Sequence, residues 1–205
     1  MFKKKYTVIK QAISKDLAAF VANYFSMQKQ VYDTCRQARY FSPYENIIGY
    51  YEDINEQIPN TYSQYSNIAM ETLMLKCQPK MEEATGLKLY PAYTYARIYK
   101  KGDELKRHKD RFSCEISTTM NLGGDDWPIY LEPSGAAGKK GIKVNLKPGD
   151  MLVYSGCELE HWREKFKGKD CAQVFLHYNN RKTPGSKNNM FDKRPHLGLP
   201  SWFKR

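Results

Sequence analysis

Two histidines and one aspartate are the residues of this sequence best suited to hold a metal ion together. His108 and Asp110 form a His-x-Asp pair in the segment KRHKDRF, and His161 follows much later in ELEHWRE. Residues i and i+2 of an extended chain point to the same side, so His108 and Asp110 can bind one ion while His161 approaches from a neighbouring strand. Two imidazoles and one carboxylate on one face suit Fe(II) and leave its other positions open.

The order of these residues along the chain gives the pattern its weight, because a His-x-Asp pair also arises by chance. A double-stranded β-helix needs the pair near the end of an early strand and the second histidine several strands later. Four strands and a turn are expected between His108 and His161, which is the required order. Of the other histidines, His177 could line a cavity or only pack in the last strand, and His196 is expected to make a contact within the C-terminal tail.

The N-terminal part, residues 1–86, is predicted to be a mainly helical support. A short strand over Tyr6–Ile9 precedes a helix for which Ser14 is a suitable N-cap. A second helix is expected from residue 66 towards residue 83, with Gly86 at its end. The segment between the helices, residues 39–64, is rich in Tyr, Pro, Asn and Gly, and we expect a long ordered loop there with the character of a lid.

The chain changes character at residue 87, where short apolar runs begin to alternate with turn residues. The runs are LKLYPAYTYARIY, CEISTTMNL, WPIYLE, IKVNLKPGDMLVYSG and CAQVFLHYN. Strands of this length and spacing suggest a sandwich or a jelly roll. Together with the order of the metal candidates they favour an α+β protein whose double-stranded β-helix, a jelly roll of the cupin-like kind, spans residues 87–180. Residues 181–205 are expected to pack on that core as a tail, so we treat 1–205 as a single domain. The tail residues expected to pack are Phe191, Leu197, Leu199, Trp202 and Phe203.

Composition excludes some classes and leaves others open. Hydrophobic residues make up 41% of the 205 residues, enough for a core, whereas no apolar stretch is long enough for a membrane span and the mean hydropathy is -0.72. Five cysteines without a Cys-x-x-Cys pair favour a reducing, cytoplasmic setting. The net charge of +11 can attract nucleic acid, anionic surfaces or acidic substrates without selecting among them.

Over residues 93–180 the sequence resembles the Fe(II)- and 2-oxoglutarate-dependent dioxygenases of the prolyl-4-hydroxylase-like branch. The matching text is YARIYKKGDELKRHKD, then NLKPGDMLVYSG with its Pro-Gly-Asp turn, then EHWREKFKGKDCAQVFLHYN. It is similar to small oxygenases carried by bacteriophages of marine cyanobacteria, which would place the protein in the host cytoplasm. The resemblance implies Fe(II) on His108, Asp110 and His161, with 2-oxoglutarate and O2 as cosubstrates and ascorbate as a further candidate.

In that family the C5 carboxylate of 2-oxoglutarate pairs with a basic residue near the start of the strand after the distal histidine. The usual offset falls here on Asp170 or Cys171, neither of which is basic. Lys169 fits if the turn is one residue shorter, and Arg163, two residues after His161, is the alternative. Three more residues are expected to line the cosubstrate site: Tyr99, Thr119 and Gln173.

The implied reaction is the hydroxylation of an unactivated C–H bond with release of succinate and CO2, and it requires no acid or base residue beyond the metal ligands. The branch favours a prolyl residue in a peptide or protein. Arg111, Trp162 and His177 are candidates for contact with the substrate or with the metal ligands. Two rivals stay open: a basic protein that binds or oxidises nucleic acid, for which the Arg-x5-Arg spacing is missing, and a metal-binding jelly roll without oxygenase activity. The oligomeric state is not readable from the sequence.

Overall fold

Two antiparallel sheets form the centre of the protein, and the computed structural model describes residues 2, 4–40 and 47–204. One sheet has seven strands in the order β1-β9-β6-β11-β4-β3-β2, and the other has four in the order β5-β10-β7-β8. The strands are β1 Tyr6–Ile9, β2 Tyr50–Tyr51, β3 Tyr62–Tyr65, β4 Leu89–Lys100, β5 Leu105–His108, β6 Ile116–Gly124, β7 Ile129–Leu131, β8 Ile142–Val144, β9 Met151–Ser155, β10 His161–Arg163 and β11 Asp170–Asn180.

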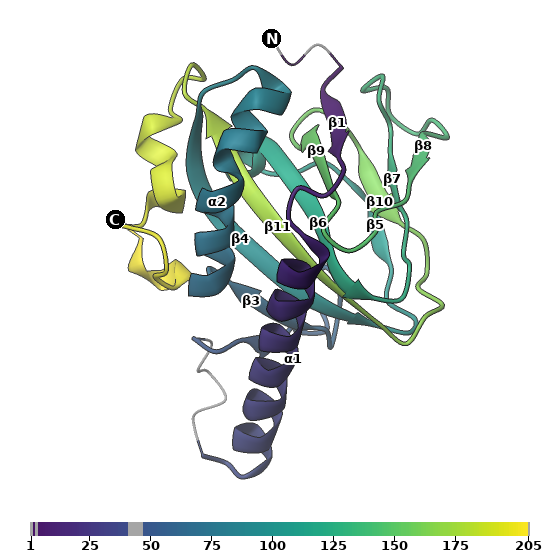
Figure 1. Ribbon diagram of the computed structural model, residues 1–205, viewed down its shortest axis with the longest axis vertical. Helices are drawn as coiled ribbons and strands as arrows, with labels where there is room; N and C mark the ends of the chain where they lie inside the picture. Colours follow the sequence, from purple (N-terminus) through teal and green to yellow (C-terminus); the bar gives the residue numbers. More distant parts are fainter. Residues whose placement is uncertain (1, 3, 41–46, 205) are drawn as a thin grey trace.

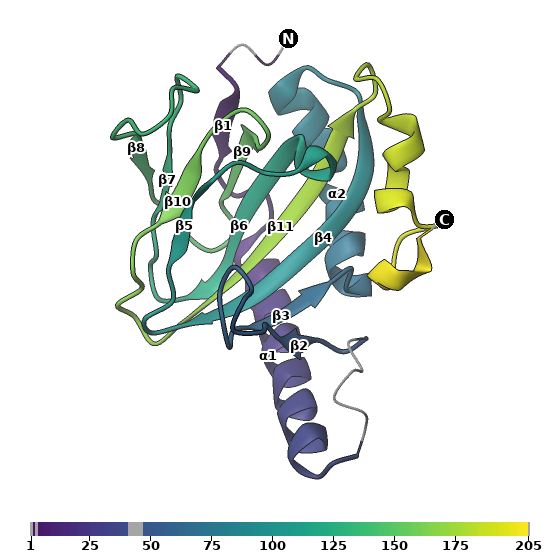
Figure 2. The same cartoon turned by 180° about the vertical axis from the view of Figure 1, so that it is seen from behind.

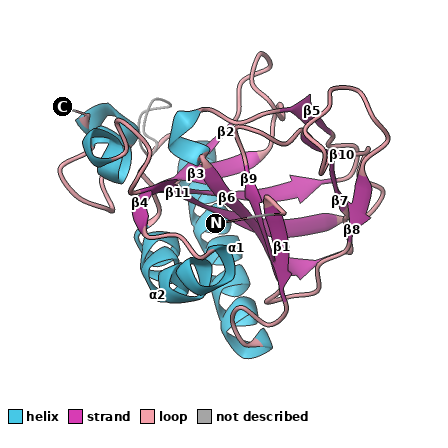
Figure 3. Ribbon diagram, turned by 90° about the horizontal axis from the view of Figure 1, so that it is seen from above, coloured by secondary structure: helices cyan, strands magenta, loops and turns pink. Residues whose placement is uncertain are grey.

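Both helices, α1 (Lys15–Gln37) and α2 (Ile68–Thr85), cover one face of the seven-stranded sheet, and the four-stranded sheet lies towards its other side (Figures 1 and 3). Ser14 caps α1 by accepting a hydrogen bond of 3.2 Å from the backbone N–H of Leu17, as predicted. The main core lies between helices and sheet and includes Phe25 of α1 and Met74 of α2. The C-terminal half of α1 extends beyond the sheet (Figure 1).

The second helix begins two residues later than its predicted start, because Asn67 caps it by accepting from the N–H groups of Ala69 and Met70. It continues through Pro79 and ends, as predicted, at Gly86. Gly86 has φ 68°, a left-handed conformation that glycine adopts without the steric cost of a Cβ atom.

The prediction of a loop over residues 39–64 is wrong in part. Residues 41–46 lie outside the described residues, but two strands, β2 and β3, follow them and extend the large sheet at β4. Both strands are too short for alternation to reveal them, and their tyrosines favour strands once a neighbouring edge is present. Tyr62 of β3 is buried against the rings of Phe25 and Tyr32, with centroid distances of 5.2 and 5.7 Å.

The C-terminal tail, which includes the 3-10 segments Lys187–Lys193 and Ser201–Phe203, runs beside β4 (Figure 2). A buried ion pair of 2.8 Å between Arg194 and Glu71 ties the tail to α2, and Leu197 packs against the main core. Trp202 and Phe203 were expected to pack, but they are 60% and 46% exposed. Ionic contacts therefore hold part of the tail where aromatic packing was expected.

The described residues include five cysteines, all of them free thiols. None of the described helices combines the length and the apolar character that crossing a membrane requires.

Candidate metal centre

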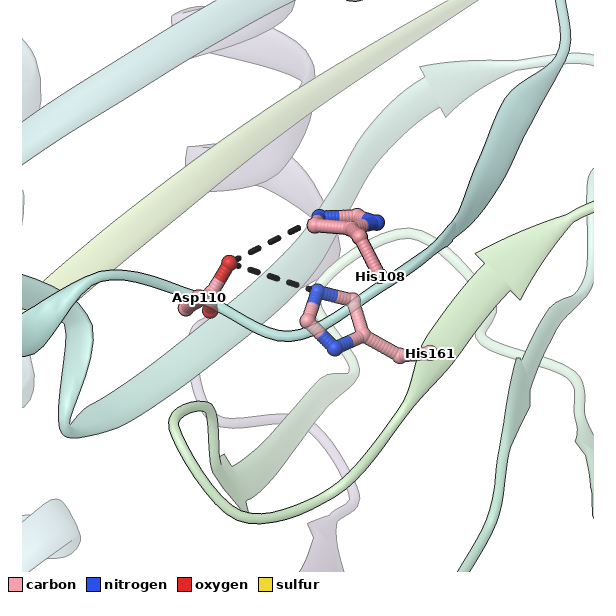
Figure 4. A group of neighbouring side chains, drawn as sticks. All are labelled: His108, Asp110 and His161. Atoms are coloured by element: carbon pink, nitrogen blue, oxygen red, sulfur yellow. Dashed lines mark ion pairs between the residues drawn. The ribbon is translucent and has the colours of Figure 1, made fainter. Parts of the chain in front are cut away.

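Two neighbouring strands of the small sheet, β5 and β10, bring the predicted ligands together. β10 pairs with β5 so that His161 lies opposite His108, and their ring centroids are 4.3 Å apart. Asp110 follows β5, and its Oδ1 lies 3.6 Å from Nε2 of His108 and 3.4 Å from Nε2 of His161 (Figure 4). Strands β6 to β9 lie between the pair and the distal histidine, in the predicted order.

Hydrogen bonds at Nδ1 of both imidazoles make Nε2, the nitrogen that faces Asp110, the atom that can bind a metal. Nδ1 of His108 lies 2.7 Å from the carbonyl oxygen of Lys106, and Nδ1 of His161 lies 3.1 Å from that of Leu159. A carbonyl oxygen only accepts, so each Nδ1 donates and each Nε2 keeps its lone pair. Burial alone would raise the pKa of Asp110, but the two imidazoles beside it outweigh burial and hold that pKa well below its usual range. The donor set fits Fe(II).

A cavity of about 480 Å³ opens beside these three residues. A hollow of about 600 Å³ adjoins it and shares the lining residues Glu56, Gln57 and His108. A smaller hollow of about 140 Å³ shares Tyr50 with it and is also lined by Tyr65 and the tail. The metal candidates therefore line the central one of three adjoining hollows, which we call the groove.

Arg163 lies deep behind the metal candidates, on the same strand as His161. The whole side chain is buried, with 1% of the residue exposed, and burial lowers the pKa of its guanidinium. Its Nη atoms donate to the carbonyl oxygen of Trp127, to Oγ1 of Thr119 at 3.1 Å and to Oε1 of Gln173 at 3.3 Å. Within the described part of the chain no carboxylate pairs with it, and its Nε has no hydrogen-bond partner.

Tyr99, the third residue expected beside the cosubstrate, belongs to the same buried group. Its ring packs edge-on against Trp127, and its hydroxyl finds no hydrogen-bond partner among the residues that the structure describes. Burial raises the pKa of Tyr99, so this hydroxyl stays protonated and can donate. Lys169, the other anchor candidate, is exposed in the turn before β11, where its backbone N–H donates to Asp125.

The three remaining candidates lie in different places. Arg111 lines the cavity and forms two hydrogen bonds, of 2.9 and 3.0 Å, with the carboxylate of Asp192 in the tail. His177 of β11 also lines the cavity and packs against Tyr93 in a tilted arrangement, at a centroid distance of 4.6 Å. Trp162 packs outside the cavity lining, beneath the guanidinium of Arg107 and against Tyr130.

Gln57 is a residue of the site that the sequence did not point to, because it lies in a loop without a repeating pattern. Its Oε1 accepts a hydrogen bond of 2.9 Å from Arg97, which in turn pairs with Glu52 at 2.7 Å. That bond turns Nε2 of Gln57 towards Nε2 of His108, at 3.1 Å. The amide therefore covers the lone pair that a metal would need.

Replacing Gln57 with methionine is expected to tighten Mn(II) binding about two- to tenfold, because a hydrogen bond worth about 0.5–1.5 kcal/mol no longer competes for His108. Calorimetric titration with Mn(II), a redox-stable substitute for Fe(II), measures the change. Asn55→Leu is the matched control, since Asn55 lies in the same loop and its hydrogen bonds within the described part of the chain go to Asp53. Unchanged or weaker binding in Gln57→Met would contradict the blocking contact.

The buried His177 predicts a loss of stability in acid. Burial lowers its pKa to about 4, against about 6.5 in an unfolded chain. Between these values the unfolded state binds the extra proton, so stability falls as the pH falls. For metal-free protein, the His177 contribution to the free energy of unfolding should drop by about 2 kcal/mol from pH 7 to pH 5. Urea denaturation should show this loss in the wild type and in His196→Phe, but not in His177→Phe; parallel profiles in all three would refute it.

Comparisons with known proteins support the fold and go no further. No family model matches the chain, and no curated protein matches its sequence. Among solved structures, a Pseudomonas putida prolyl-4-hydroxylase aligns with a TM-score of 0.57 at 15% identity, covering 87% of this chain and 94% of that one. The viral collagen prolyl hydroxylase vCPH from Paramecium Bursaria Chlorella virus-1, in its 2OG complex, gives 0.56 at 10% identity, with coverages of 85% and 96%.

EctD from S. alaskensis, with bound Fe, gives a TM-score of 0.59 at 15% identity and covers 89% of this chain and 79% of its own. At such identities the likeness is one of fold. The chain has the α+β double-stranded β-helix fold of the 2-oxoglutarate- and Fe(II)-dependent oxygenases, which confirms the predicted fold class.

Proposed function

We propose that this protein is an Fe(II)- and 2-oxoglutarate-dependent oxygenase that hydroxylates a prolyl residue in a polypeptide. The observation that carries the cosubstrate assignment is the buried guanidinium of Arg163, which has no carboxylate partner among the described residues. Burying an unpaired charge destabilises the folded protein by several kcal/mol, and a purely structural role for Arg163 offers no interaction that offsets this penalty. The carboxylate of a bound ligand supplies the missing partner.

Each residue of the site has a distinct part in this proposal. His108, Asp110 and His161 hold the iron, which together with 2-oxoglutarate and O2 supplies the oxidising power for C–H hydroxylation when bound. Arg163, in preference to Lys169, pairs with the C5 carboxylate. The hydroxyl of Tyr99 can donate a further hydrogen bond to that carboxylate, whereas Thr119 and Gln173 accept from the guanidinium and hold it in place.

The groove supports a polypeptide substrate over a small molecule. Its three hollows extend from the loop at Gln57, past the metal candidates, to the tail at Pro200. Tyr50, Tyr93 and Tyr95 form an aromatic wall in its middle. Flat rings of this kind can pack against a prolyl ring without demanding a further hydrogen bond.

The two rival functions fit these observations less well. A metal-binding jelly roll without oxygenase activity has no use for an unpaired guanidinium beside the metal. A nucleic-acid protein would use its basic residues for phosphate contacts, whereas Arg163 is buried and Arg111 is neutralised by Asp192. The likeness to phage oxygenases and a location in the cytoplasm remain predictions.

Succinate release tests the proposal directly. Iron-loaded protein with 2-oxoglutarate should release succinate faster with a proline-containing decapeptide than with the same peptide carrying alanine, and mass spectrometry should find one added oxygen atom on the proline. Oxidation of single-stranded DNA instead would support the nucleic-acid reading. Binding of metal without any effect of 2-oxoglutarate would refute the oxygenase.

A further inference from the structure

The two oxygens of the Asp110 carboxylate face different surroundings. Oδ1 lies towards His108 and His161, at 3.6 and 3.4 Å from their Nε2 atoms (Figure 4). Oδ2 lies on the other side and accepts a hydrogen bond of 2.9 Å from Oγ of Ser117. Only Oδ1 is therefore turned towards the metal candidates.

The hydroxyl of Ser117 has three polar neighbours within hydrogen-bonding distance but only one proton to donate. Its Oγ lies 2.9 Å from Oδ2 of Asp110, 2.8 Å from the carbonyl oxygen of Cys114 and 3.0 Å from Nδ1 of His177. If the proton pointed to His177, two oxygens would face the lone pairs of Oγ without a proton between them. The hydroxyl proton therefore points to the oxygens, and Nδ1 of His177 must be the donor to Oγ.

The backbone fixes this arrangement. Ser117 of β6 and His177 of β11 are register partners in the large sheet, and they are 0% and 6% exposed. The His177 ring packs against Tyr93, with the two ring planes tilted by 33°. Gly156 closes the other side of Oδ2, because a Cβ atom at that position would collide with Oδ2 itself and with the carbonyl oxygen of Cys114.

We infer that His177 and Ser117 are positioning residues that orient Asp110 so that it binds the metal through Oδ1 alone. His177 donates from Nδ1 to Oγ of Ser117, and Ser117 donates to Oδ2 of Asp110. This fixes one tautomer of His177, the one protonated at Nδ1. The inference rests on the metal site of the proposed function and adds to it two residues that never touch the metal.

The test measures Co(II) binding, without cosubstrate or substrate. Ser117→Ala and His177→Phe should each weaken Co(II) affinity about 10–100-fold, the usual cost of losing a partner of a metal ligand. They should also change the intensity of the Co(II) d–d bands, because a carboxylate free to turn can bind through both oxygens and alter the coordination number. His177→Gln keeps an N–H donor and should restore most of the affinity, whereas His177→Phe keeps only the ring.

A second measurement needs no variant. Nitrogen-15 NMR of the histidine rings in metal-free wild-type protein should find Nδ1 of His177 protonated and Nε2 unprotonated. The reverse tautomer would overturn the inference. Equal Co(II) affinities and spectra in the wild type, Ser117→Ala and His177→Phe would also overturn the inference, while leaving the metal site intact. A wild-type protein that binds no Co(II) would refute both the inference and the metal site of the proposed function.

Discussion

Replacing His108 with alanine is expected to lower the affinity for Fe(II) by more than about 100-fold. Losing a hydrogen-bond partner of a ligand already costs about 10–100-fold, and here one of three ligands would be lost. His108 is also the safest of the three to replace, because its side chain is 26% exposed whereas that of His161 is 3% exposed. The folded protein should therefore survive the change.

The measurement is an anaerobic titration with Fe(II) and 2-oxoglutarate that follows the visible metal-to-ligand charge-transfer band. Wild-type protein should develop the band only when both are present, and His108→Ala should not develop it. His196→Ala is the control, since His196 is an exposed residue of the tail. If His108→Ala retains the band at wild-type concentrations of Fe(II), the assignment of the three ligands is wrong.

Replacing Arg163 with methionine should separate stability from cosubstrate binding. The free energy of unfolding of the ligand-free protein should stay the same or rise, because an unpaired buried charge is exchanged for an apolar side chain of similar length. The affinity for 2-oxoglutarate should fall by at least about 30-fold, since losing one partner of a buried charge pair costs about 2 kcal/mol or more.

Calorimetric titration of Mn(II)-loaded protein with 2-oxoglutarate and thermal unfolding without it give the two quantities. Lys169→Met is the matched control, and because Lys169 is exposed it should change neither. A larger loss of affinity in Lys169→Met than in Arg163→Met would exchange the roles of the two residues. Small and equal losses would mean that the carboxylate binds elsewhere.

Of all parts of the site, the metal candidates were the part that could best be predicted from the sequence. His108, Asp110 and His161 could be selected because extended-chain geometry limits which donors share a face, and the structure brings them together. The same alternation, applied to Thr119, would have pointed to Ser117, which lies two residues earlier on β6. The choice between Arg163 and Lys169 could not be made, because it depends on which side chain the turn buries.

The shortest strands are the part of the fold that could not be predicted from the sequence. β10 has three residues and β2 has two, too few for a periodic pattern, although β10 holds both a metal candidate and the buried guanidinium. Gln57 reaches His108 because Arg97 and Glu52 fix its loop, and those contacts span at least 40 residues of sequence. Contacts between distant segments of this kind are decided by packing.

β10 places His161 and Arg163 two residues apart, with β5 on one side and β7 on the other. A small slide or tilt of this strand moves both side chains at once, so a shift that improves one contact changes the other. In the proposed enzyme, iron and 2-oxoglutarate would thus act on the same strand, and any change that one causes in the affinity for the other would be returned by an equal factor.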